Sequence, residues 1–243
     1  MIDLLLLALL GGIVWLVSTD GPWGAAITFV SVLIGGLVAM NFFEILAVTL
    51  SRLVALPPEW QVRWDILAFW GIFALAVFLL RMMGEQLLPT YAELSPPVYQ
   101  GAKWGFAFLT AYVFVAITCT TLHIAPLPRE FLGFTAESQN LFGLKPDRHW
   151  LGFTQQASEY SLSRVGRDGQ PTIFDGAVFR SNPEDDRTTA VWSSFPIRYA
   201  ARRQLYASGG VVQSAPVAPV SPGSGGSGPP RVNRSPNAGT GGF

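Results

Sequence analysis

Two long uncharged stretches open the chain, separated by a short polar turn. Residues 4–19 and 21–43 carry no charged side chain, and Asp20 lies between them. A helix rises about 1.5 Å per residue, so roughly 17–25 apolar residues cross a hydrocarbon core of about 30 Å. The cluster Ser18-Thr19-Asp20-Gly21-Pro22 combines turn formers with candidate helix caps. The pattern predicts a helical hairpin that enters a membrane and returns.

Two further apolar stretches follow the hairpin. Residues 66–80 are short for a span, so this helix requires Arg81 to snorkel toward the headgroups. Residues 104–128 form the fourth stretch, and prolines separate the helices. We therefore predict an all-α membrane protein whose four transmembrane helices form an antiparallel bundle within residues 1–125. The predicted spans are residues 2–19, 22–46, 64–83 and 103–124.

The pattern changes at Pro126. Residues 126–207 are predicted to form a small mixed or irregular extramembrane region, and the Gly/Pro/Ser-rich residues 208–243 a disordered tail. Residues 197–206 are typical of an amphipathic basic helix. Two interpretations stay open for it, contact with an anionic lipid surface or a solvated helix packed on the tail. Its basic side chains are Arg198, Arg202 and Arg203.

Composition narrows the class of protein. Charged residues make up 13% of the 243 residues, where soluble domains usually have about 25%. The formal net charge is zero, so no basic field indicates nucleic-acid binding. The single cysteine, Cys119, excludes an internal disulfide and a cysteine-based metal cluster. The start lacks the basic region of a signal peptide, which favours a retained first helix.

Tryptophans lie near the ends of the predicted spans. Indole rings favour the boundary between acyl chains and headgroups. We predict that five of them anchor the protein at the membrane interfaces, namely Trp15, Trp23, Trp60, Trp64 and Trp104.

Small residues recur at four-residue spacing in two spans. They are Ser31, Gly35 and Ala39 in the second span, and Gly101 and Gly105 at the start of the fourth. Small side chains let helix backbones approach closely in lipid, where the hydrophobic effect does not drive association. The two interpretations are packing within the four-helix unit and an interface between copies.

Polar residues near membrane depth fit structural roles. Glu44 and His123 lie near span ends, which favours headgroup placement, and the hydroxyls of residues 118–121 are expected to bond backbone carbonyls one turn back. No nucleophile motif, metal motif or phosphate-binding loop surrounds His123 or His149. We therefore predict no enzymatic activity, no cofactor and no metal site.

The chain resembles the colicin V production (CvpA) family of bacterial inner-membrane proteins. The resemblance covers about residues 1–124 and rests on Ile2-Asp3, on Gly21 between the first two spans, and on the Gly101-x-x-x-Gly105 pair. Asp20 and neutral residues replace the basic pair that the family has around the first loop. The extended tail looks like that of planctomycete members of the family.

The resemblance implies a multi-pass protein of the bacterial inner membrane that is associated with toxin production or export. One class of function is an accessory or scaffold protein with a secretion or envelope partner. The alternative is an oligomeric small-solute transporter or channel. The expected partners are the lipid bilayer, a further copy of the chain or an envelope protein, and no nucleic acid. Basic residues near the span ends leave the orientation open.

Overall fold

The computed structural model describes residues 2–54, 63–87, 94–125 and 141–158, four short strands, Phe195 and Tyr199. Its helices are α1 (Ile2–Ser18), α2 (Gly21–Leu53), α4 (Arg63–Leu87), α5 (Pro96–Ile124) and α6 (Pro146–Gln156). Three of them, α2, α4 and α5, are long and apolar enough to cross a membrane. The predicted first span is a shorter apolar helix of 17 residues, α1.

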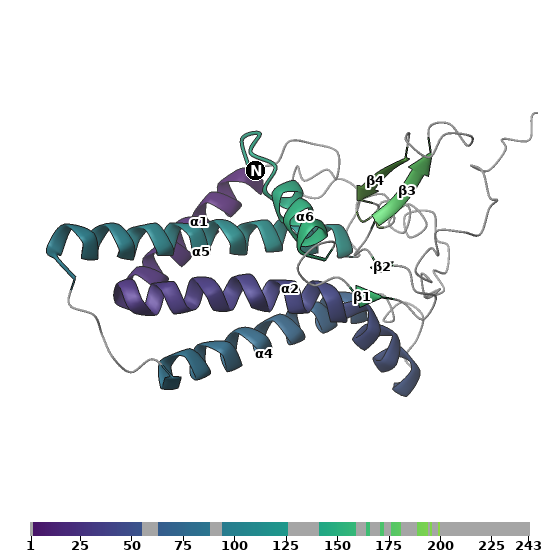
Figure 1. The fold of residues 1–243 in the computed structure, drawn as a ribbon, viewed down its shortest axis with the longest axis horizontal. Coiled ribbons are helices and arrows are strands. Elements are labelled where there is room, and N and C mark those ends of the chain that lie inside the picture. Colours follow the sequence, from purple (N-terminus) through teal and green to yellow (C-terminus); the bar gives the residue numbers. More distant parts are fainter. Residues whose placement is uncertain are drawn as a thin grey trace, which may run out of the picture.

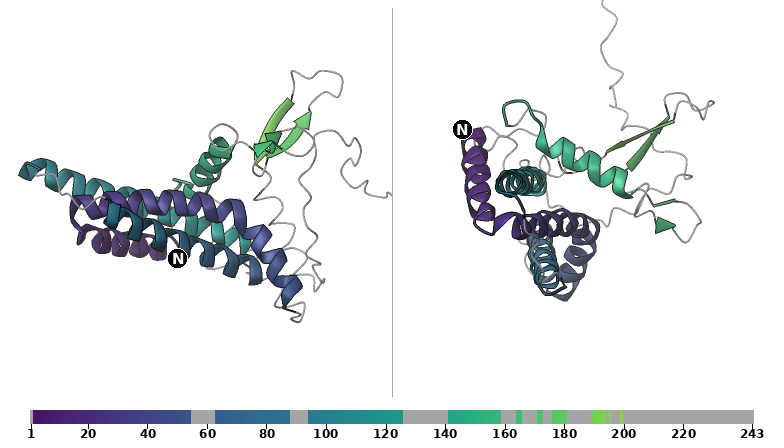
Figure 2. Two further views of the ribbon diagram at one scale, coloured as in Figure 1. Left: turned by 60° about the horizontal axis from the view of Figure 1, so that its bottom comes forward. Right: turned by 60° about the vertical axis from the view of Figure 1, so that its left-hand side comes forward.

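The three long helices lie side by side (Figure 1). Helix α2 packs against both α4 and α5, and α1 packs mainly against α5. In Figure 1, α2 and α5 run in one direction and α4 runs in the other, while α1 crosses the group obliquely. Helix α6 lies on the outside of this helical unit, next to α5 (Figure 2).

Two small antiparallel ladders follow α6 in the chain. Strand β1 (Arg164–Val165) pairs with β2 (Pro171–Thr172), and β3 (Gly176–Arg180) pairs with β4 (Thr189–Ser193). The second ladder brings Gly176 opposite Ser193. A lone two-stranded ladder is marginally stable in water. These strands are therefore minor additions to a helical protein.

The turn between α1 and α2 differs in detail from its prediction. The hydroxyls of Ser18 and Thr19 donate to carbonyls three residues back, at 2.8 and 2.6 Å, so they satisfy the end of α1. Asp20 flanks α2 without a side-chain capping bond. Gly21 has a φ of 73°, a left-handed conformation that glycine adopts without cost, and Pro22 lies in the first turn of α2.

Helices α2 and α5 extend well beyond their predicted spans, while α4 exceeds its own by one residue at its start and four at its end. Helix α5 begins at Pro96, where a loop was predicted, because proline is compatible with the first helical positions, whose N–H groups have no partner in the helix. Helix α2 continues to Leu53, so it measures about 50 Å at 1.5 Å per residue. Both helices are longer than a hydrocarbon core of about 30 Å.

Glycines bring α2 and α4 close together. A Cβ on Gly35 would lie 2.7 Å from the Val77 Cγ2 atom, and a Cβ on Gly84 would lie 2.7 Å from the Ile27 Cγ2 atom. Acyl chains are as apolar as leucine, so such close packing stabilises helix contacts where the hydrophobic effect does not.

Aromatic side chains fill the centre of the unit. The rings of Phe43 on α2 and Phe69 on α4 are both fully buried and meet edge to face, with centroids 5.7 Å apart. The rings of Trp70 and Phe73 on α4 contact Phe114 on α5, at 5.7 and 5.8 Å. Edge-to-face pairs add roughly 0.5–1.5 kcal/mol each beyond area burial. The three long helices therefore enclose a packed interior.

Candidate functional site

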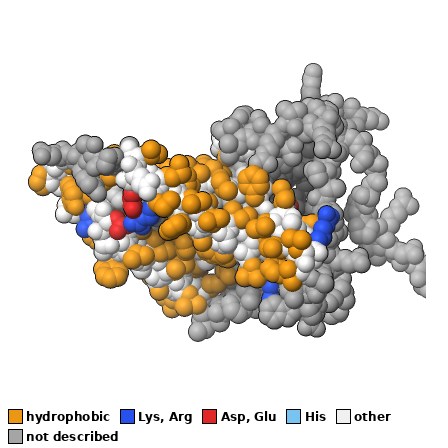
Figure 3. Space-filling model, turned by 90° about the horizontal axis from the view of Figure 1, so that it is seen from below, with side chains coloured by type: hydrophobic (Ala, Val, Ile, Leu, Met, Phe, Trp, Pro, Cys, Tyr) orange, Lys and Arg blue, Asp and Glu red, His pale blue; other side chains and the backbone are white. Residues whose placement is uncertain are grey.

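A belt of exposed apolar side chains surrounds the helical unit. Figure 3 shows these side chains over the middle of one face of the molecule, with most of the charged side chains toward its two ends. Large exposed apolar patches mark interaction surfaces, and acyl chains are the partner that matches a belt of this chemistry. The belt includes Leu4, Leu5 and Leu7 of α1, Val30 and Ile34 of α2, Leu75 and Phe78 of α4, and Phe108 and Leu109 of α5.

The predicted aromatic anchors lie near helix ends. Trp15 is 69% exposed close to the end of α1, and Trp104 is exposed on α5 beside Lys103, whose ammonium lies 5.4 Å from the Trp104 ring centroid. Trp23 and Trp64 are half-buried at the starts of α2 and α4. Trp60 lies outside the described residues.

The two small-residue stripes have different surroundings. Ser31, Gly35 and Ala39 are buried, and Gly35 faces α4 within the same chain. Gly101 and Gly105 are exposed, and a Cβ at either position would have nothing within 4 Å. Lipid or another chain could therefore approach the α5 backbone closely at these two glycines.

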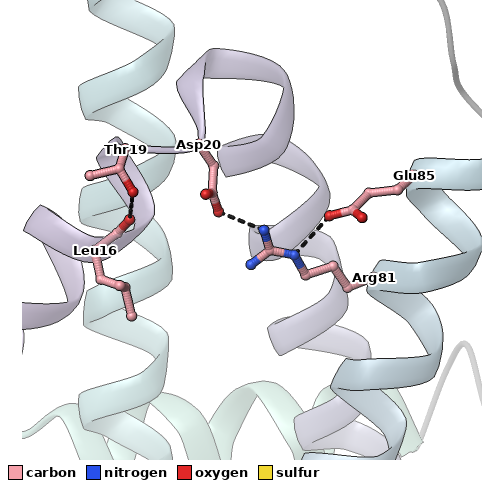
Figure 4. A network of polar contacts seen from close by, with 5 residues as sticks. All are labelled: Leu16, Thr19, Asp20, Arg81 and Glu85. Carbon is pink, nitrogen blue, oxygen red and sulfur yellow. Dashed lines mark hydrogen bonds and ion pairs between the residues drawn. The ribbon is translucent and has the colours of Figure 1, made fainter.

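An arginine pairs with two carboxylates at one end of the unit. The Arg81 guanidinium on α4 lies 2.8 Å from the Asp20 carboxylate and 3.0 Å from that of Glu85 (Figure 4). All three groups are partly exposed, so each pair contributes little, about 0.2–1 kcal/mol. The pairing fixes the α1–α2 turn to the end of α4 and shows how Arg81 reaches a polar partner.

A buried hydrogen bond to a carboxylate attaches α6 to α5. His123 Nε2 donates a hydrogen bond to the Asp147 carboxylate at 3.0 Å, and His123 is fully buried. His123 thus contacts a carboxylate from further along the chain, and its predicted placement at headgroup depth stays a prediction. Nearby, Thr118 and Thr120 donate to the Phe114 and Ala116 carbonyls one turn back, which confirms the role predicted for these threonines.

Charge and burial act on Asp147 in opposite directions. Burial raises the pKa of Asp147, while the hydrogen bond from His123 and the nearby positive charges of His123 and Arg148 lower it further than burial raises it. The net pKa of the carboxyl group is below its usual 3.8. Asp147 is therefore ionised at neutral pH.

A tryptophan seats α6 against α2. A Cβ on Gly36 would lie 2.6 Å from Trp150 Cζ2 and 2.7 Å from Ile117 Cδ1, so only glycine leaves room for the indole between α2 and α5. The Trp150 N–H group has no hydrogen-bond partner among the described residues. A second polar contact joins the Tyr112 hydroxyl on α5 to His149 Nδ1 at 2.5 Å. Helix α6 is thus held by shape and by polar bonds.

The chain returns to the helical unit beyond the strands. The fully buried Phe195 ring lies 6.4 Å from that of Phe43, and the Tyr199 hydroxyl donates to the Glu44 carboxylate at 3.3 Å. Arg198, Arg202 and Arg203, predicted as possible lipid contacts, lie outside the described residues.

Comparisons with protein-family models, curated proteins and solved structures found no match to this chain. Among the described residues, no group of three or more His, Cys, Asp or Glu side chains is placed to hold a metal ion. Function is therefore inferred from the shape, packing and charge of the described residues.

The attachment of α6 was missed in the sequence. Its apolar face is short, and its partners Gly36 and His123 lie far from it along the chain. The doublet Gly35-Gly36 did not reveal it, because a second doublet, Gly11-Gly12 in α1, has no neighbour within 4 Å of either added Cβ. Gly35 faces α4 and Gly36 faces α6.

Proposed function

We propose that this chain is a multi-pass protein of the bacterial inner membrane that acts as an accessory scaffold. The observation that carries the proposal is the packed interior between α2, α4 and α5, where aromatic rings occupy the space that a conduit through one copy needs. The belt of exposed apolar side chains supports a membrane location. In this proposal α1 is a fourth crossing helix, which makes the unit a four-helix antiparallel bundle.

The resemblance to the colicin V production family supports the same role. It implies an association with toxin production or export, in which the chain holds an envelope or secretion partner at the membrane. The open surface at Gly101 and Gly105 is the observation that favours the alternative, an oligomeric transporter or channel.

The mass of the complex in native-lipid nanodiscs tests the scaffold against the pore. We expect no symmetric homo-oligomer, and in the absence of a bound partner a single chain of 26.4 kDa. Gly101→Leu and Gly105→Leu should leave that mass unchanged. A symmetric homo-oligomer that the two leucine variants dissociate would overturn the scaffold proposal. Gly71→Leu on α4 is the matched control, since its α-carbon is equally open.

Basic side chains in the structure favour one orientation. Arg52, Arg63, Lys145 and Arg148 belong to the end of the unit where α2 ends and α4 begins, while Arg81 and Lys103 belong to the other end. Short loops rich in lysine and arginine stay in the cytoplasm. We propose that the N-terminus and α6 are cytoplasmic.

Thiol labelling in spheroplasts tests this orientation. In a Cys119→Ala background, we expect Gln100→Cys at the exposed start of α5 to react with an impermeant maleimide from outside. Arg52→Cys at the end of α2 should react only after permeabilisation. The reverse pattern would show that the N-terminus faces outward.

A further inference from the structure

The turn before α6 has an unusual backbone. Leu141, Phe142 and Lys145 have φ angles of 53°, 53° and 48°, and Gly143 between them has 90°. Left-handed conformations cost energy in residues with a side chain, so a run of them persists only where surrounding contacts hold it. The backbone N–H of Leu141 supplies one such contact by donating to the Asp3 carboxylate at 2.8 Å.

This turn presents two large apolar side chains outward. Phe142 is 69% exposed and Leu144 is 55% exposed, while the side chain of Leu141, which precedes them, is buried. In water, exposing these side chains is unfavourable, so it does not compensate for the cost of the left-handed backbone. Two basic side chains follow within four positions of Leu144. Lys145 is exposed, and Arg148 is 44% exposed, with its Nε atom 3.7 Å from the Asp147 carboxylate.

The turn lies where α1 begins. Leu141 packs in one apolar cluster with Ile2 and Leu6 of α1 and with Val115 and Cys119 of α5. Helix α1 has 17 residues, about 25 Å, which is short of a hydrocarbon core of about 30 Å. Phe142 and Leu144 therefore extend the apolar surface of α1 beyond the first residue of that helix.

We propose that residues 142–148 form a binding site for an anionic phospholipid at the membrane interface. Phe142 and Leu144 insert among the upper acyl carbons, and the Lys145 and Arg148 side chains bind the headgroup phosphate. Apolar tips beside cations match an amphipathic anionic ligand, whereas a free phosphate in water would engage only the cations. The inference rests on the proposed membrane location and adds a lipid class to it.

Binding in detergent tests the headgroup part. The purified chain is titrated with phosphatidylglycerol and with phosphatidylcholine. Lys145→Gln and Arg148→Gln should each weaken phosphatidylglycerol binding about fivefold and leave phosphatidylcholine binding unchanged. Lys103→Gln, which removes one positive charge from the other end of the unit, should change neither. Equal losses in Lys103→Gln, or no loss in the other two variants, would overturn the site.

Spin-label depth in phosphatidylglycerol nanodiscs tests the apolar part. In a Cys119→Ala background, labels at Phe142→Cys and at Leu5→Cys, an exposed position in the belt of α1, are compared by their access to oxygen and to a water-soluble nickel complex. We expect both labels to favour oxygen, with Leu5 deeper. If only the Phe142 label is in water, the lipid site is wrong and the membrane location stands. If both are in water, both proposals fail.

Discussion

Gly36→Leu is expected to release α6 from the helical unit. Even the first atom of the new side chain would lie 2.6 Å from the Trp150 ring and 2.7 Å from Ile117 Cδ1. The isoleucine can turn its terminal methyl aside, but the rigid indole ring can make room only if Trp150 itself moves. Overpacking of this kind costs about 1–3 kcal/mol, which raises the population of undocked α6 by roughly five- to a hundredfold. The rate of tryptic cleavage after Arg148 measures that population when undocking is fast compared with cleavage.

Gly12→Leu provides the matched control. Gly12 lies in the apolar helix α1, and a Cβ there would have nothing within 4 Å. The same glycine-to-leucine change should therefore leave cleavage after Arg148 within about twofold of the parent. Unchanged cleavage in Gly36→Leu itself would show that Trp150 is not what holds α6.

Asp147→Ala is expected to have the other large effect. The change leaves the fully buried His123 ring without the carboxylate that accepts its hydrogen bond, and removing one partner of a buried hydrogen bond typically costs about 1–3 kcal/mol. The thermal midpoint of the purified chain in detergent should fall, and cleavage after Arg148 should rise. Glu85→Gln is the control, because its pair with Arg81 is exposed and contributes less than about 1 kcal/mol.

The lowered pKa of Asp147 leads us to expect that acid destabilises the folded protein. The folded pKa of Asp147 lies below its ordinary value of 3.8, so ionised Asp147 stabilises the folded state above that value. The stabilisation is lost as the pH falls below 3.8 and through the folded pKa. Thermal melts between pH 7 and pH 3 should show this loss in the parent and a smaller one in Asp147→Asn. Parallel curves for the two proteins would contradict the assignment.

The long helices could be predicted from apolar runs because a membrane span is a local property of the sequence. The length of residues 21–43 and their lack of charge were enough to predict α2. Helix ends were less predictable, as the start of α5 at Pro96 shows, since a proline either ends one helix or starts the next.

The candidate site could not be predicted because its contacts join distant residues. Asp20 pairs with Arg81, which lies 61 positions further along the chain. The partner of His123, Asp147, lies 24 positions further along the chain. Periodicity identifies which face of a helix is apolar but does not identify which distant side chain covers it.

The residues that contact Trp150 are synthesised before Trp150 itself. Gly36 and Ile117 are both made before Trp150, and Gly36 precedes it by 114 positions. At about 5–20 residues per second, the ribosome needs roughly 6–23 s to cover that distance. Throughout that interval the space beside Gly36, which the Trp150 indole later fills, has no indole in it. Placement of α6 therefore follows the synthesis of all three long helices, and a chain truncated before Trp150 lacks the indole that packs on Gly36.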